Sequence, residues 1–202
     1  MNAEEELSRA IIRLMLDEPF FAHFLGQVSR IISKDITKTA AVGLRNKAIC
    51  LFINPDFFLQ ELKTIDERIA VLKHEVLHLV FKHLFRHQAS WNSHVANVAA
   101  DLVVNQYVAP WPLPEGAILL EQFDVLDLES EKTVEHYYEK LIKAKAEAPK
   151  QIAALDSMLG NESKDSNGSG DKRSKEQVER EKQAWEKIKD ILEGEQNSGA
   201  WM

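Results

Sequence analysis

The sequence has little of what a disulfide-bonded, secreted or membrane protein needs. Its single cysteine, Cys50, cannot form a disulfide within the chain, and its apolar neighbours are typical of a buried, reduced thiol. No run of about 18 apolar residues occurs, so no membrane span is expected. The first residues are acidic and lack the positive segment and apolar core of a signal peptide. These absences favour a cytoplasmic protein.

Positive charge is also in short supply. The 25 Lys and Arg residues are outnumbered by 32 Asp and Glu residues, which gives a formal net charge of −7. Because binding to phosphates needs a basic face, we expect neither nucleic acid nor an anionic membrane surface as a partner. Hydrophobic residues make up 45% of the 202 residues, which is enough to bury the core of one domain.

Hydrophobic residues are missing altogether from residues 161–177, which include the run Ser166-Asn167-Gly168-Ser169-Gly170. Such a segment cannot bury apolar surface. We therefore predict a domain over residues 1–150, a disordered linker over 151–177 and a C-terminal amphipathic helix over 178–202. The apolar face of that helix is too weak to keep it helical in isolation, so it must dock on another part of the protein.

Within the predicted domain, hydrophobic spacing indicates mostly helices and one small hairpin. Residues 4–33 are predicted to form two helices, the second of which continues to Ile32. Two short apolar runs, 40–44 and 48–53, flank a polar turn and predict a β-hairpin. Further helices are expected from residue 65 to about residue 87 and over 95–108. The predicted fold class is α+β, with the small sheet packed on the first of these two helices.

That helix carries an HExxH motif. Thr64 and Glu67 form a capping-box pattern at its start, and His74, Glu75 and His78 follow. Positions i and i+4 differ by only about 40° around a helix, so the two histidines can bind one tetrahedral zinc ion. Glu75 is offset and can reach a water held on the metal. The motif favours a zinc-dependent metallopeptidase with Glu75 as general base; the alternative is an amphipathic helix with surface histidines.

Asp101 is the predicted third zinc ligand. It lies in a stretch of small apolar residues, where a carboxylate is costly to bury unless a cation accompanies it. Asn97 and Asn105 are each one helical turn away, and either could hydrogen-bond a ligand. His94 is the next choice as a ligand. An exposed aspartate, or one paired with an arginine, is the alternative to the ligand role.

The remaining histidines and tyrosines are harder to place. On a continuous helix His83 and His87 would lie about 140° and about 180° around from His78, so both are expected to be solvated. A peptidase also needs a donor for the oxyanion, for which the candidates are Tyr107, Tyr137, Tyr138, His94 and His136. The strand near residues 48–53 is a candidate for pairing with a peptide substrate at a sheet edge.

Several of these residues also carry a family resemblance. They are Ile53-Asn54-Pro55, the HExxH run with His83 after it, Ala100-Asp101-Leu102-Val103-Val104-Asn105 and, more weakly, Thr133-Val134-Glu135-His136-Tyr137-Tyr138. Over about residues 5–145 the chain resembles bacterial metallopeptidases whose HExxH domain is commonly joined to a von Willebrand factor A-like domain. The resemblance implies a zincin-like α+β fold, a zinc ion, a cytoplasmic setting, and Asp101 as a ligand with Asn105 nearby.

The resemblance also implies partners. Such proteins are often encoded near AAA+ ATPases, so an ATPase or a von Willebrand A-like protein is an expected partner besides a peptide or protein substrate. A zinc-binding module that is catalytically silent and recruits such partners is the alternative function. The chain departs from the family pattern because it stops at Met202 without a von Willebrand-like domain. The terminal helix, with Trp185 and Trp201, is expected to be the remnant of a junction to that domain.

Overall fold

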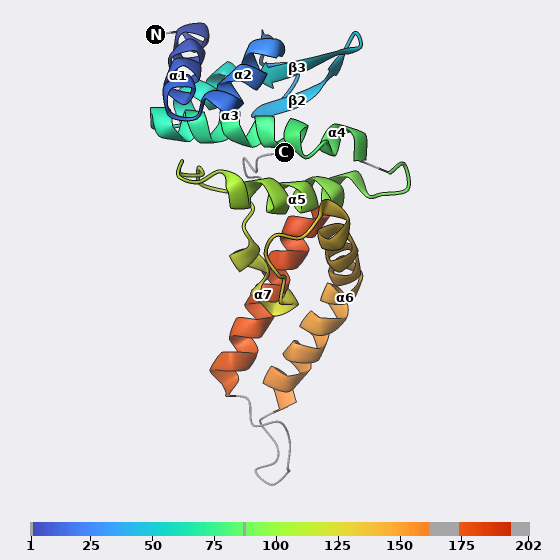
Figure 1. The fold of residues 1–202 in the computed structure, drawn as a ribbon. Helices are drawn as coiled ribbons and strands as arrows, with labels where there is room; N and C mark the ends of the chain where they lie inside the picture. The colour runs from blue at the N-terminus through green and yellow to red at the C-terminus, as the bar shows by residue number, and fades with distance from the viewer. Residues whose placement is uncertain (1, 87, 162–173, 195–202) are drawn as a thin grey trace.

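The computed structural model describes residues 2–86, 88–161 and 174–194 (Figure 1). In chain order its elements are α1 (Ala3–Asp17), α2 (Pro19–Gln27), β1 (Ser29–Ile32), β2 (Ala40–Arg45), β3 (Ala48–Ile53), the π-helical turn η1 (Phe57–Glu61), α3 (Ile65–Val80), α4 (His83–Arg86), α5 (Ser93–Val104), the 3-10 turns η2 (Asn105–Tyr107) and η3 (Leu120–Leu126), α6 (Val134–Asn161) and α7 (Lys175–Glu193). The chain is mostly helical with one small sheet, which is consistent with the predicted α+β class. Within the described ranges, no helix has the length and apolar character needed to cross a membrane.

The sheet has three strands in the order β1-β3-β2. The predicted hairpin is confirmed: β2 and β3 are antiparallel, and the turn residues Asn46 and Lys47 adopt the positive φ angles of a tight hairpin. The prediction that the second helix continues to Ile32 is wrong, because Ser29–Ile32 forms β1, parallel to β3. β-Branched Ile31 and Ile32 fit a paired strand well. β3 is therefore the central strand, and β2 rather than residues 48–53 forms the edge that faces α3.

Helix α3 begins at the predicted capping box. The Thr64 side chain accepts a hydrogen bond from the Glu67 backbone N–H, and the Glu67 carboxylate accepts one from the Thr64 N–H. The helix ends at Val80 instead of near residue 87, because Lys82 has a φ of 60° and a left-handed residue cannot continue an α-helix. The chain restarts as the short helix α4.

Helices α3 and α5 contact each other at the middle of the molecule (Figure 1), and two hydrophobic cores meet along them. The first lies among α1, α2, α3 and the sheet, and its largest buried side chains include Leu14, Leu25, Leu51, Phe58 and Leu72. The second lies among α5, α6, α7 and η3, and its largest include Leu102, Phe123, Tyr137 and Leu141. A residue of α3 and a residue of α5 can therefore meet at the junction of the two cores.

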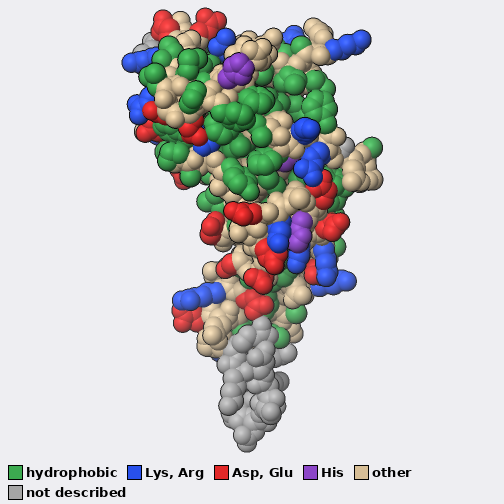
Figure 2. All heavy atoms as spheres, in the orientation of Figure 1, with side chains coloured by type: hydrophobic (Ala, Val, Ile, Leu, Met, Phe, Trp, Pro, Cys, Tyr) green, Lys and Arg blue, Asp and Glu red, His purple; other side chains and the backbone are tan. Residues whose placement is uncertain are grey.

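Some apolar side chains belong to neither interior. Ile12, Met15, Leu16 and Phe20, on α1 and α2, are each more than half exposed. Figure 2 shows hydrophobic side chains gathered over the part of the molecule that holds α1, α2 and the sheet, and charged side chains over the part that holds α6 and α7. A contiguous apolar surface of this kind is typical of a protein interaction site.

The C-terminal part differs from the expected linker. Residues 151–161 are helical and belong to α6, since Ile152, Leu155 and Leu159 recur at helical spacing and pack in the second core together with α7. Helix α7 docks there as expected, but Ser174 caps it and it begins at Lys175, inside the segment predicted as linker. Lys145 and His94 contact its last carbonyl groups, those of Leu192 and Ile191. The linker prediction also includes residues 162–173, and the junction prediction includes Trp201. Both lie outside the described residues.

The packing of residues 151–161 can be tested by truncating Leu155, which is only 3% exposed on α6. Leu155→Ala should lower the free energy of unfolding by about 2–5 kcal/mol, because it leaves a cavity against α7. Met158→Ala, at a side chain that is 44% exposed on the same helix, is the matched control and should change it by less than about 0.5 kcal/mol. Urea denaturation followed by circular dichroism measures both, and equal effects would contradict the packed helix.

Candidate metal centre

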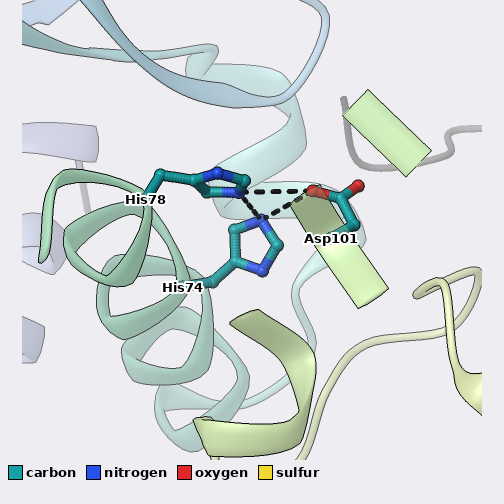
Figure 3. Close-up of side chains that lie close together, drawn as sticks. All are labelled: His74, His78 and Asp101. Atoms are coloured by element: carbon teal, nitrogen blue, oxygen red, sulfur yellow. Dashed lines mark hydrogen bonds and ion pairs between the residues drawn. The ribbon is translucent and has the colours of Figure 1, made fainter. Parts of the chain in front are cut away.

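The two histidines of the HExxH motif point from one face of α3 toward a common space (Figure 3). Their Nε2 atoms are 2.9 Å apart. The His74 ring is almost fully buried, whereas His78 lies nearer the surface. The capped, apolar helix therefore delivers both imidazoles as the i, i+4 spacing predicts.

Asp101 comes to the same space from α5. Its Oδ1 atom lies 3.2 Å from His78 Nε2 and 3.5 Å from His74 Nε2 (Figure 3). Asn92 caps the start of α5 by accepting a hydrogen bond from the Val95 N–H, which fixes where this helix begins. One ligand atom from each of the three side chains lies within 4.8 Å of the other two. The structure thus brings together all three residues that the sequence nominated as ligands.

The electrostatics of this trio favour a bound cation. Burial alone would lower the pKa of His74, but the hydrogen bond and negative charge of Asp101 outweigh it and raise that pKa. Burial alone would raise the pKa of Asp101, but its hydrogen bonds to His74 and His78 lower it. The second oxygen of Asp101, Oδ2, is buried without a hydrogen-bond partner among the described residues. A buried carboxylate facing two imidazole nitrogens fits a divalent metal ion.

Asn105 orients the first of these imidazoles. Its Oδ1 atom is 2.7 Å from His74 Nδ1, and its amide nitrogen donates to the Ile118 carbonyl at 2.8 Å. Because that second bond commits the amide nitrogen as donor, Oδ1 must accept, and His74 carries its hydrogen on Nδ1. With a metal ion in place of the proton that Nε2 shares with Asp101, the lone pair of Nε2 would face the metal. Of the two asparagines that the sequence proposed for this task, the structure selects Asn105; Asn97 is exposed on the wall of the cavity.

Glu75 borders the same space and is held by the sheet. It is buried, and its Oε2 atom accepts a hydrogen bond of 2.7 Å from the Val42 backbone N–H of β2. Val42 can spare this N–H because β2 is the edge strand of the sheet. The bond joins the motif helix to the edge strand, and it occupies one of the two carboxylate oxygens.

A cavity of about 300 Å³ opens beside these groups. The metal trio and Glu75 form part of its wall. Apart from these, most of the wall is apolar and comes from β2, α4, α5, α6 and the loop before α5, namely Ala40, Ala41, Val42, Leu84, Trp91, Ala96, Ala100 and Val134. The site is therefore accessible to a ligand with an apolar group.

His83 also lines this cavity, and the expectation that it is solvated is wrong. The left-handed Lys82 ends α3 and turns His83 back, so that its Nδ1 atom lies 3.0 Å from Nδ1 of His78. Burial, followed by the charges of His78 and Arg86, lowers the pKa of His83 to about 3, so its ring is neutral. A positive φ at a lysine leaves no signal in the sequence, so the pattern could not reveal this contact. His87 lies outside the described residues.

Three of the other candidate side chains make hydrogen bonds outside the cavity. His94, the alternative ligand, contacts the Ile191 carbonyl of α7. The Tyr137 hydroxyl donates to the Glu129 carbonyl, and the Tyr138 hydroxyl accepts from the Asn92 N–H. None of the five side chains proposed as oxyanion donors lines the cavity as the described residues form it: Tyr107, Tyr137, Tyr138, His94 and His136.

Comparison with known proteins gives two matches. A family model described as "Putative metallopeptidase domain" matches residues 2–201. An uncharacterized protein of Thermotoga maritima is 27% identical over 134 residues, which are 66% of this chain and 32% of that protein. The chain thus matches about a third of the length of that relative. No solved structure matches the chain.

The orienting role of Asn105 can be tested against Asn97, one turn to the other side of Asp101. Asn105→Leu removes the acceptor for His74 and should weaken the binding of a divalent metal ion, with Zn²⁺ as the probe, about 10- to 100-fold. Asn97→Leu should leave that dissociation constant unchanged, because among the described residues no hydrogen bond joins its amide to His74, His78 or Asp101. Competition with a chromophoric chelator measures both constants. An equal loss in the two variants would contradict the assignment.

Proposed function

Because the chain belongs to the family described as "Putative metallopeptidase domain", we propose that it is a zinc-dependent peptidase. His74, His78 and Asp101 are the zinc ligands, and Glu75 is the general base. The observation that carries the proposal is the meeting of His74 Nε2, His78 Nε2 and Asp101 Oδ1 in one cavity that Glu75 also lines.

The donor set favours zinc in a catalytic rather than a structural site. Two imidazole nitrogens and one carboxylate oxygen are a common zinc ligand set, whereas structural zinc usually has four protein ligands. Within the described part of the chain three ligands meet, which leaves a position for water. When bound, zinc lowers the pKa of that water and polarises the substrate carbonyl.

Glu75 is placed to handle the proton of the hydrolysis. The Val42 N–H holds one carboxylate oxygen, which keeps the side chain turned toward the cavity. The other oxygen can accept a proton from the attacking water and then deliver it to the amine that leaves. The neighbouring His74 directs its Nδ1 to Asn105. Metal binding by His74 and proton transfer by Glu75 are therefore carried out by separate groups.

The edge strand suggests how a peptide would bind. Ala40, Ala41 and Val42 of β2 line the cavity, and β2 pairs with β3 on one side only. An extended peptide can add as a further strand along the part of this edge that Glu75 does not occupy, which would lay its backbone across the metal site. A motif helix beneath an edge strand is consistent with a zincin-like fold, which we propose for this domain.

A second candidate function is a zinc-binding module that is catalytically silent and recruits a protein partner. The exposed apolar side chains of α1 and α2 favour it, since they offer a surface that neither core uses. An AAA+ ATPase or a von Willebrand A-like protein is the proposed partner in that case. Retention of Glu75 beside the metal trio favours the peptidase, because a structural zinc site needs no base.

Metal content tests the site itself. The purified, tag-free protein should hold about one zinc ion per chain by elemental mass spectrometry. His78→Ala and Asp101→Ala should lose it, whereas His23→Ala, at an exposed histidine of α2, should keep it. If the wild type holds no metal after zinc is added and the excess removed, the peptidase proposal is refuted and a helical interaction domain remains.

Catalysis is tested separately with Glu75→Gln. The variant keeps the shape of the side chain but loses the base, so it should retain zinc and cleave peptides about 10²- to 10⁴-fold more slowly. A quenched-fluorescence peptide library, with zinc measured in the same samples, supplies both readouts. A fully active Glu75→Gln would rule out Glu75 as base, and a zinc-loaded wild type without cleavage of any peptide would favour the recruiting module.

A further inference from the structure

We infer that His83 is a positioning residue for the metal centre: it accepts a hydrogen bond from Nδ1–H of His78 and thereby holds that ligand in the form that binds metal. The inference rests on the proposed metal site and extends it to a side chain outside the HExxH motif and outside the ligand trio. It starts from one contact, the 3.0 Å distance between the Nδ1 atoms of His78 and His83.

The contact requires one shared hydrogen. The two rings are inclined by 71° with their centroids 5.1 Å apart, so the contact is edge-on and not a stack. Two imidazole nitrogens 3.0 Å apart form a hydrogen bond only when one carries a hydrogen and the other offers a lone pair. The tautomer of one ring therefore sets the tautomer of the other.

The metal space decides which ring donates. His78 Nε2 faces His74 Nε2 and Asp101 Oδ1, and it can bind a metal ion only through its lone pair. In the metal-bound protein a neutral His78 therefore carries its hydrogen on Nδ1, whereas without metal its Nε2 lies within hydrogen-bond distance of His74 Nε2 and Asp101 Oδ1. Nδ1 of His78 donates to His83, in the same way that His74 donates to Asn105 on the other side of the site. Each histidine of the motif thus has its own acceptor.

The same logic gives the tautomer of His83. Since its Nδ1 accepts, its hydrogen lies on Nε2. That nitrogen is buried without a partner among the described residues, in a side chain that lines the cavity. A buried N–H donor without an acceptor is costly, so a carbonyl oxygen of a bound peptide would relieve that cost.

The fold holds His83 in place from several sides. Its ring stacks on Phe81 at 5.8 Å with an angle of 21° between the planes. Lys82, left-handed, sets the turn that brings the ring back to α3. At the other end of α4, Arg86 makes two hydrogen bonds to Glu135 of α6, at 2.9 and 2.7 Å. An acceptor fixed in this way can restrain the His78 ring.

Zinc affinity is the first test. His83→Phe supplies an aromatic ring that can still stack on Phe81 but has no hydrogen-bond acceptor. The zinc dissociation constant should therefore rise about 10- to 100-fold. His83→Asn places an amide oxygen near the position of Nδ1 and should recover most of that loss. His23→Phe, at an exposed histidine, is the control and should bind as wild type does. Chelator competition on samples with matched circular dichroism spectra gives the constants.

Nitrogen NMR on the wild type tests the tautomers without any variant. In the zinc-loaded, ¹⁵N-labelled protein, long-range imidazole correlations should place the hydrogen of His78 on Nδ1 and that of His83 on Nε2. The reverse tautomer at His83, or a His83→Phe protein that binds zinc as tightly as wild type, would overturn the inference. A wild type that holds no zinc would instead refute the proposed function, so the two failures can be told apart.

Discussion

The burial of a carboxylate and two imidazoles at the junction of two hydrophobic cores is the constraint on which the site depends. His74 and Asp101 are each only 3% exposed, and neither can be buried at low cost without a charge partner. The surrounding contacts hold these buried polar groups in place. Asn105 fixes one imidazole, His83 contacts the other, and the edge strand holds the neighbouring glutamate.

The site belongs to neither core alone. Helix α3 packs in the first core and supplies the histidines, whereas α5 packs mainly in the second and supplies Asp101. A metal ion bound here would link the two, so metal binding and the packing of α3 on α5 would stabilise each other. The ion pair between Arg86 and Glu135 crosses the same junction at the rim of the cavity. The C-terminal helix α7 completes the core against which α5 packs.

Much of the candidate site could be predicted from short stretches of the chain. The capping box at Thr64, the spacing of His74 and His78, and a carboxylate in the apolar run around Asp101 are all local features. The predictions that fail do so where residues distant in the sequence, or a single backbone angle, decide the structure. The spacing of Ile31 and Ile32 predicts a helix, because no neighbouring residue indicates that they pair with the distant strand β3. The linker is predicted to include residues 151–161 because α7, the helix against which they pack, follows only after the polar stretch that separates the two in the sequence.

By itself the sequence determined the hairpin, the motif helix and the identity of the groups that meet at the metal space, because capping, turn formation and helical periodicity act over a few residues. Tertiary structure alone decided that Asn105 rather than Asn97 supports His74, that β2 rather than β3 is the free edge, and that His83 turns back onto His78. The physical reason is that each of these outcomes depends on how elements pack or on the backbone angle of one lysine, neither of which a residue pattern encodes.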